Sequence, residues 1–218
     1  IQLMAAVASH QLEDGVIAGV GTGLPMIAGL LAQKTHAPSL IIFFESGGIA
    51  PVVPRLPLSV GDSRCMYRAV AATGLAGIME TGQRGMIDYA FLGGAEVDMY
   101  GNINSTVLGD HDSPKVRLPG SGGANDFGSL SWRTIIIARH DKAKLPERVS
   151  FITTPGFIDG PGARERAGLP PGTGPYRVIT NLALMGFDEA TCRMKLISVH
   201  PGVTIDQVVE NTGFELII

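Results

Sequence analysis

Residues 41 to 48 read Ile41-Ile42-Phe43-Phe44-Glu45-Ser46-Gly47-Gly48, an apolar run that ends in a carboxylate and in residues that allow a sharp turn. Four bulky apolar residues in a row predict a short strand buried on both faces, as in a parallel sheet covered by helices. A carboxylate at the carboxyl end of such a strand lies at the edge of the sheet where ligands of α/β folds bind. Its position alone is more typical of a solvated strand end, so any role for Glu45 depends on the rest of the chain.

The chain on either side of this stretch alternates between apolar runs and helical patterns. Further buried strands are predicted at residues 16–20, 87–92, 134–138 and 149–156. Helices are predicted at residues 4–12, 26–35, 63–72, 79–86 and 204–212, the last one capped by Gly213. In the third of these helices, Arg64 and Arg68 are expected to share one face. That face could bind a carboxylate or a phosphate, but a solvated helix face is the more typical explanation.

Shorter alternating segments predict antiparallel pairing at the margins of the sheet. Residues 97–104 alternate around Tyr100-Gly101-Asn102 and predict a hairpin. The segments 178–180, 182–188 and 194–200 predict a terminal antiparallel meander. We therefore expect one α/β domain over residues 1–218, with a mostly parallel open sheet flanked by helices and an antiparallel fringe.

Composition excludes several classes of partner. The chain has 218 residues and a formal net charge of −3, which gives no basic field for nucleic acid. Two cysteines, Cys65 and Cys192, are too few for a disulfide framework and fit a reducing compartment. No apolar run approaches the length of about 18 residues typical of a membrane span, and the first residues lack a signal-peptide pattern. We expect a soluble cytoplasmic protein with no membrane partner and, because it begins with Ile1, the ordered middle of a longer chain.

Two glycine-rich turns are candidate binding loops. Gly21-Thr22-Gly23-Leu24-Pro25 links a predicted strand to a predicted helix, where unpaired N–H groups can bind an anion. It lacks the third glycine of a dinucleotide fingerprint, and a tight strand-to-helix turn is the more typical explanation. The second turn, Gly120-Ser121-Gly122-Gly123-Ala124-Asn125-Asp126, has more glycines than a loop needs. Such a cluster indicates a positive φ or a close approach of another group to the backbone.

The remaining polar side chains reduce the number of reaction types that fit this sequence. The five histidines lack metal-ligand spacing, which disfavours a metal hydrolase. Ser46 has neither a Gly-x-Ser-x-Gly pattern nor an assignable base, which disfavours a serine hydrolase. A carboxylate between two glycine-rich segments suits a reaction in which the carboxylate is the nucleophile. Free glutamate has a pKa of about 4.3, so it is ionised at neutral pH and requires no general base.

Short motifs follow one another in a fixed order along nearly the whole chain. They are Gly19-Val20-Gly21-Thr22-Gly23-Leu24-Pro25, Glu45-Ser46-Gly47, Pro54-Arg55, Ser59-Val60-Gly61-Asp62, Gly93-Gly94-Ala95, Tyr100-Gly101-Asn102, Asn104-Ser105-Thr106, Gly109-Asp110, Pro114-Lys115, Gly120-Ser121-Gly122-Gly123-Ala124-Asn125, Pro155-Gly156, Ile158-Asp159-Gly160-Pro161-Gly162 and Glu210-Asn211-Thr212-Gly213-Phe214. In these motifs the chain resembles the class I CoA-transferases, specifically the β subunits of the glutaconate CoA-transferase type. Departures at Gly48-Ile49-Ala50 and at Met99 leave the acid substrate open.

The resemblance implies an α/β fold with an active site shared between two subunits. An α subunit would be the partner, and the substrates would be an acyl-CoA and a carboxylic acid, which we expect to be dicarboxylic. Coenzyme A would act as a substrate, with no metal required. The resemblance also identifies Glu45 with the catalytic glutamate of the family. Relatives in the same fold that hydrolyse a ring or release carbon dioxide tend to lack a glutamate at this position.

We therefore expect Glu45 to carry coenzyme A as a glutamyl thioester during a ping-pong transfer. Backbone N–H groups in the second glycine cluster are candidates to meet the oxyanion or the CoA, although a structural turn also explains the cluster. These candidates are Gly120, Gly122, Gly123 and Ala124. Candidates for supporting loops are Ser46, Gly47, Gly93 and Gly94. Two alternatives stay open, an acyl-CoA hydrolase of the same fold and a non-catalytic partner subunit.

Overall fold

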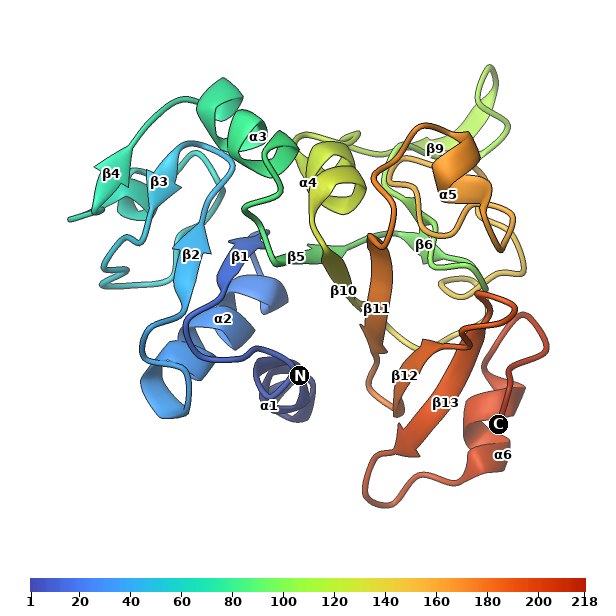
Figure 1. Ribbon diagram of the computed structural model, residues 1–218. Coiled ribbons are helices and arrows are strands. Elements are labelled where there is room, and N and C mark those ends of the chain that lie inside the picture. Colours follow the sequence, from blue (N-terminus) through green and yellow to red (C-terminus); the bar gives the residue numbers. More distant parts are fainter.

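The computed structural model describes residues 1–218 and contains one nine-stranded sheet and two small two-stranded sheets (Figure 1). Its five central strands are parallel and lie in the order β11 (Gly174–Ile179), β10 (Arg133–Ile137), β5 (Tyr89–Gly93), β1 (Ile17–Val20) and β2 (Ile41–Phe43). Antiparallel strands extend both edges, namely β12 (Ala183–Phe187) and β13 (Met194–Val199) beyond β11, and β3 (Gly48–Ile49) and β4 (Ala71–Ala72) beyond β2. The predicted fold class, with the terminal meander, is confirmed.

The sheet is buried on both faces because alternate residues of its central strands enter two different cores. Tyr89 and Phe91 of β5 belong to one hydrophobic cluster, whereas Ala90 and Leu92 belong to the other. Neighbouring side chains point to opposite faces of a strand, so a fully apolar run fits a strand covered on both sides.

Four helices provide most of this cover. The helices α1 (Gln2–Ser9) and α2 (Leu24–Thr35) pack on one face, and α3 (Leu75–Gln83) and α4 (Ala124–Leu130) lie on the other (Figure 1). The smaller elements are η1 (Ser63–Met66), β6 (Glu96–Val97), β7 (Ile103–Asn104), β8 (Val107–Gly109), β9 (Pro114–Arg117), α5 (Ala163–Arg166) and α6 (Ile205–Glu210). None of the helices is both long enough and apolar enough to cross a membrane.

The helix predicted at residues 63–72 is wrong. The only helical turn there is η1, which ends at Met66, and the next residue, Tyr67, is extended. Arg68 then has a φ of 50°, so Arg64 and Arg68 do not share a helical face. The chain turns back because Ala71 pairs with Ile49 of β3. Pairing with the sheet edge thus overrides the local helical pattern.

The strand predicted at residues 149–156 is also wrong, because this segment makes one isolated bridge, between Thr154 and Ile103. Much of its backbone bonds to buried side chains instead. The N–H of Ser150 donates to Glu96 Oε2 at 2.8 Å, and the N–H of Gly156 donates to Asn102 Oδ1 at 2.8 Å. These side chains replace a neighbouring strand as hydrogen-bond partners.

Other boundaries move by a few residues. The first helix ends at Ser9 rather than near Leu12, and α3 occupies Leu75–Gln83 rather than residues 79–86. The final helix is fixed at its start by a capping box between Thr204 and Gln207. Gly213 does not cap it, since its N–H donates to the Leu145 carbonyl at 2.9 Å. The hairpin predicted at residues 97–104 is confirmed as the β6–β7 pair.

Candidate active site

Glu45 lies in the tight turn between β2 and β3, at the carboxyl end of the parallel strands. Hydrogen bonds of 2.9 Å join the Phe44 N–H to the Gly48 carbonyl and the Gly47 N–H to the Phe44 carbonyl. Gly47 has a φ of +115°, and a Cβ atom there would overlap the Thr73 carbonyl oxygen. Only glycine fits this turn. Glu45 is half-buried, and its carboxylate reaches the residue that precedes α4.

The second glycine cluster meets this carboxylate directly. The N–H of Gly123, the residue before α4, donates to Glu45 Oε2 at 2.7 Å. A Cβ atom on Gly123 would lie 2.5 Å from Glu45 Oε2 and 2.7 Å from Met79 Cε. Gly122 has a φ of +49°, and its Cβ position would lie 3.5 Å from both carboxylate oxygens. Two predicted site segments separated by 78 residues thus meet at one carboxylate.

The environment of Glu45 leaves the carboxylate available for chemistry. Neither Lys nor Arg forms an ion pair with it, and its Oε1 atom accepts no hydrogen bond within the chain. The donor on Oε2 is the residue immediately before α4, where the partial positive charge of the helix end favours an anion. A carboxylate oriented by one neutral donor keeps one oxygen free, as a nucleophile requires.

The other predicted residues lie at different distances from this centre. The N–H of Gly120 donates to the Ser105 carbonyl at 2.9 Å and not to Glu45. The N–H of Ala124 donates to the Ser121 carbonyl at 2.9 Å. Ser46 follows Glu45 in the turn, and its hydroxyl oxygen is buried without a hydrogen-bond partner. These positions support the turn and the glycine segment, whereas Gly122 and Gly123 face the carboxylate.

Gly93 and Gly94 lie elsewhere on the same edge of the sheet, where β5 ends. They line a pocket of about 650 Å³ together with Leu24, Arg139 and Lys144. Glu45 is not part of this lining. The structure therefore does not bring these two glycines to the carboxylate. No cluster of three or more His, Cys, Asp or Glu side chains is arranged to hold a metal ion.

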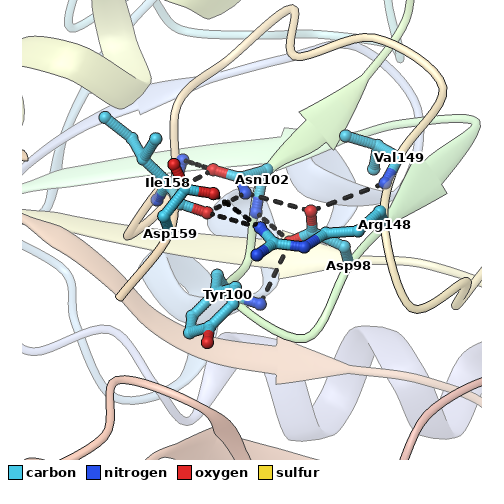
Figure 2. Close-up of polar contacts among 8 residues, drawn as sticks. Asp98, Tyr100, Asn102, Arg148, Val149, Ile158 and Asp159 are labelled. Atoms are coloured by element: carbon cyan, nitrogen blue, oxygen red, sulfur yellow. Dashed lines mark hydrogen bonds and ion pairs between the residues drawn. The ribbon is translucent and has the colours of Figure 1, made fainter. Parts of the chain in front are cut away.

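Sequence reasoning missed a buried polar network at the β6–β7 hairpin. Asp98 is 1% exposed and accepts bonds from the Asn102 N–H at 3.1 Å, the Asn102 amide at 3.0 Å and the Tyr100 N–H at 3.0 Å (Figure 2). Burial raises the pKa of Asp98, and these donors oppose the rise. The sequence did contain a signal for this network. Two acids, Glu96 and Asp98, stand two residues apart, and two asparagines, Asn102 and Asn104, follow at the same spacing across the hairpin. Buried acids require hydrogen-bond donors such as these asparagines.

This network fixes the loop that follows residue 148. Figure 2 shows Asn102 between Asp98 and the backbone of Ile158, whose N–H donates to Asn102 Oδ1 at 3.1 Å. At the surface of this network, Arg148 forms a 3.0 Å ion pair with Asp159, and its guanidinium lies over the Tyr100 ring. The loop from 149 to 158 is thereby tied to the β6–β7 hairpin through side chains.

Comparison with known proteins places this geometry in a family. Residues 1–211 match the family model of coenzyme A transferase. The chain belongs to the coenzyme A transferase family. It is 41% identical over 221 residues to a subunit of glutaconate CoA-transferase from Acidaminococcus fermentans, covering 99% of this chain and 82% of that one. It is 39% identical to a subunit of 3-oxoadipate CoA-transferase from Pseudomonas knackmussii, covering 99% and 83%.

The fold of this coenzyme A transferase matches a solved relative over its whole length. The crystal structure of glutaconate coenzyme A-transferase from Acidaminococcus fermentans superimposes with a TM-score of 0.95 at 38% identity. The alignment covers 100% of this chain and 85% of that one. The family resemblance predicted from the motifs is confirmed, and so is the prediction that the chain is a CoA-transferase enzyme subunit.

Proposed function

We propose that this chain is the catalytic subunit of a CoA-transferase that moves coenzyme A from an acyl-CoA to a carboxylic acid, with Glu45 as the nucleophile. The observation that carries the proposal is the Glu45 carboxylate held at 2.7 Å by the Gly123 N–H, with its second oxygen free. Its place at the carboxyl edge of a parallel sheet is where this class of fold binds ligands.

The first half-reaction converts the carboxylate into a thioester. A Glu45 oxygen attacks the thioester carbon of the acyl-CoA, and the C–S bond breaks to give a mixed anhydride and CoA thiolate. The thiolate then attacks the glutamyl carbonyl carbon. The C–O bond to the original acyl group breaks, releasing the acid and leaving a glutamyl-CoA thioester. No proton is gained or lost in either step.

The second half-reaction reverses these steps with another acid. The incoming carboxylate attacks the glutamyl thioester and expels CoA thiolate, and the thiolate attacks the acyl carbon of the new anhydride. The new acyl-CoA leaves, and Glu45 returns as a carboxylate. The reaction is a ping-pong exchange, because the first product departs before the second substrate reacts.

The Gly123 N–H is suited to the oxyanion that forms on the glutamyl carbon. In the free enzyme it bonds Glu45 Oε2, and that oxygen becomes the glutamyl carbonyl oxygen of the anhydride and of the thioester. When thiolate or carboxylate adds to this carbon, negative charge develops on the oxygen that the N–H already contacts. One such donor is worth about 3 kcal/mol in the transition state.

A dicarboxylic acid and a partner subunit complete the proposal. Both relatives that are about 40% identical are named for dicarboxylic acids, glutaconate and 3-oxoadipate, and each is named as one subunit of its enzyme. Apolar side chains are also exposed between the Glu45 turn and α3, at Val52, Leu56, Leu58, Tyr67, Val70 and Leu75. A reactive anhydride must be shielded from water, and an α subunit on this side of the site would supply the shield.

The test is transfer by the assembled enzyme. The chain is purified with its natural partner, and a panel of acyl-CoA donors is combined with dicarboxylate and monocarboxylate acceptors while new acyl-CoA is measured by mass spectrometry. Transfer should be abolished by Glu45→Gln and kept by Glu80→Gln on the exposed surface of α3. Rapid CoA release without any acceptor would instead identify an acyl-CoA hydrolase, and normal transfer by Glu45→Gln would exclude Glu45 as the nucleophile.

A further inference from the structure

The position of the Gly123 N–H depends on a segment with little internal structure of its own. Residues 118–123 connect β9 to α4, and Gly120 and Gly122 in this segment have φ values of +94° and +49°. Glycines at positive φ are conformationally free, so the segment requires outside contacts to hold one geometry. Those contacts come from two places, one on each side of Gly123.

Ser105 holds the side that precedes Gly123. Its carbonyl accepts the Gly120 N–H at 2.9 Å, and its hydroxyl donates to the Gly120 carbonyl at 3.0 Å. Both the N–H and the carbonyl of Gly120 are therefore hydrogen-bonded to Ser105. The neighbouring residue strengthens the attachment, since the Thr106 carbonyl accepts the Leu118 N–H at 2.9 Å.

Asn125 holds the side that follows Gly123. It lies in the first turn of α4, and its side-chain amide donates to the Thr153 carbonyl at 2.7 Å. This bond joins the start of the helix to the loop from 149 to 158, which the buried hairpin network fixes.

Thr153 connects the two attachments to each other. It is 4% exposed, and its hydroxyl accepts the Ser105 N–H at 2.8 Å while its carbonyl accepts Asn125. Behind Ser105, the buried Asn104 amide donates to Glu96 Oε2 at 2.7 Å, and the same oxygen accepts the Ser150 N–H. Both sides of the glycine segment are therefore attached, through Ser105 and Asn125, to the same buried residue, Thr153.

We propose that Ser105 and Asn125 are positioning residues for the transfer reaction, which set the place of the Gly123 N–H against Glu45. Neither side chain bonds to Glu45. Each acts through the backbone between residues 118 and 125, so its loss shifts the N–H rather than removing it. This inference rests on the proposed function, because the effect of that shift is defined by the oxyanion on the glutamyl carbon.

The test compares Ser105→Ala and Asn125→Ala with a matched control in the enzyme assembled with its partner. Ser9→Ala is the control, because the Ser9 hydroxyl also donates to a backbone carbonyl, that of Ala6 at 2.8 Å, and lies on α1. In each of the two variants, the Gly123 N–H should move relative to Glu45 by well under one ångström. This displacement should lower kcat about tenfold and leave the KM for acyl-CoA unchanged. Ser9→Ala should keep the kcat of the natural enzyme, and Ser105→Thr, which retains the hydroxyl, should recover most of the loss.

A second readout reports the position of the segment without using catalysis. Hydrogen–deuterium exchange of a peptide covering residues 118–127 should be faster in both variants and unchanged in Ser9→Ala. The inference is overturned if kcat in both variants equals that of Ser9→Ala, if KM rises with kcat constant, or if the loss follows thermal stability and Ser105→Thr does not restore it. Failure of the proposed function is separate, since it would be seen as normal transfer by Glu45→Gln whatever these variants do.

Discussion

Gly123 can donate its N–H to the Glu45 carboxylate only because it has no side chain. Its φ is −81°, which any residue can adopt, so the requirement for glycine comes from space rather than from backbone conformation. The neighbouring Gly122 is different, since its φ of +49° disfavours other residues whatever the space. A substitution at Gly123 therefore tests the site with less backbone strain than one at Gly122.

We predict that Gly123→Ala lowers kcat about 100-fold or more, while the free energy of unfolding changes by only about 1 kcal/mol. The added Cβ would lie 2.5 Å from Glu45 Oε2, and the carboxylate can move away at little cost to the fold. The control is Gly74→Ala before α3, where a Cβ has nothing within 4 Å. Thermal melts and steady-state kinetics give the two quantities, and equal losses of rate and stability would make the cluster a structural turn.

The element that presents Gly123 is α4, and its carboxyl end is held by a buried arginine. Arg164 is 2% exposed, and its guanidinium donates to the carbonyls of Ser129 at 3.2 Å and Gly156 at 2.9 Å, and to the Thr173 hydroxyl at 2.8 Å. Burial lowers the pKa of Arg164 to about 10, which still leaves it charged at neutral pH. A cation on the last carbonyls of a helix is favourable, and here it joins α4 to the loop before β11.

Replacing this arginine should weaken the fold strongly. We predict that Arg164→Met lowers the free energy of unfolding by about 2–4 kcal/mol, because several buried carbonyls lose their donor at once. Arg166→Met is the control two residues away, since Arg166 is exposed and makes one long contact of 3.4 Å to the Pro161 carbonyl. Urea unfolding of both variants is the measurement, and similar stabilities would show that Arg164 does not hold these segments together.

A second element-level anchor should make stability depend on pH. His140 is 4% exposed and lies between the hydroxyls of Thr180 at 2.9 Å and Thr212 at 3.0 Å, which connects the end of β10 to the segment after α6. Burial lowers the pKa of His140, so the folded state favours the neutral ring. In the unfolded chain a histidine binds a proton below about pH 6.5.

The sign of the effect follows from this difference in proton binding. As pH falls below about 6.5, the unfolded state takes up a proton that folded His140 resists, so the free energy of unfolding decreases. We predict that His140→Gln, whose amide can still donate to one threonine and accept from the other, loses this part of the pH dependence. Urea unfolding at pH 7.5 and 5.5 compares the two proteins, and an identical decrease in the variant would assign the effect elsewhere.

At the scale of the whole molecule, one edge of the sheet is left uncovered. The short strands β3 and β4 lie at the far left of Figure 1, and both residues of β4 are exposed. Leu58 and Val70 near this edge are 88% and 84% exposed. Apolar side chains grouped beside a sheet edge are typical of a surface that another protein covers.

We predict that the chain purified alone transfers no CoA and that activity returns with the partner subunit. Val70→Glu should reduce recovery of the partner in co-purification, because a charge would be buried in the contact. Val209→Glu on α6, which lies on the opposite side of the molecule from β3 and β4 (Figure 1), should not reduce that recovery. Full turnover by the single chain, or equal recovery with both variants, would contradict a shared active site on this edge.

Local patterns were sufficient for much of this molecule. The run from Ile41 to Phe44 predicted a buried parallel strand, and the density of glycines around Gly122 predicted a close approach to the backbone. Both predictions rest on short-range chemistry. The helix at residues 63–72 failed because Ala71 found a partner strand whose position no local pattern reveals. The strand at residues 149–156 failed because its partners are side chains of residues about 50 positions earlier in the chain.

The contacts that complete the candidate site are all long-range. Glu45 and Gly123 are 78 positions apart, and nothing local to either residue indicates that they meet. Asn125 and Thr153 are joined in the same way. The family motifs led to the expectation that Glu45 is the nucleophile, and the glycine cluster had given four candidate donors. The structure shows which of these donors contacts Glu45, namely Gly123, and which residues anchor it.

The covalent intermediate on Glu45 is the central claim, and it can be trapped. The assembled enzyme is incubated with acyl-CoA and no acceptor acid, treated with borohydride, which reduces a thioester to an alcohol, and digested for peptide mass analysis. We predict that the change lies within residues 41–48 at Glu45 and disappears in Glu45→Gln, which keeps the size of the side chain but removes the anionic nucleophile. A label on any other residue, or transfer without a label on Glu45, would contradict the account.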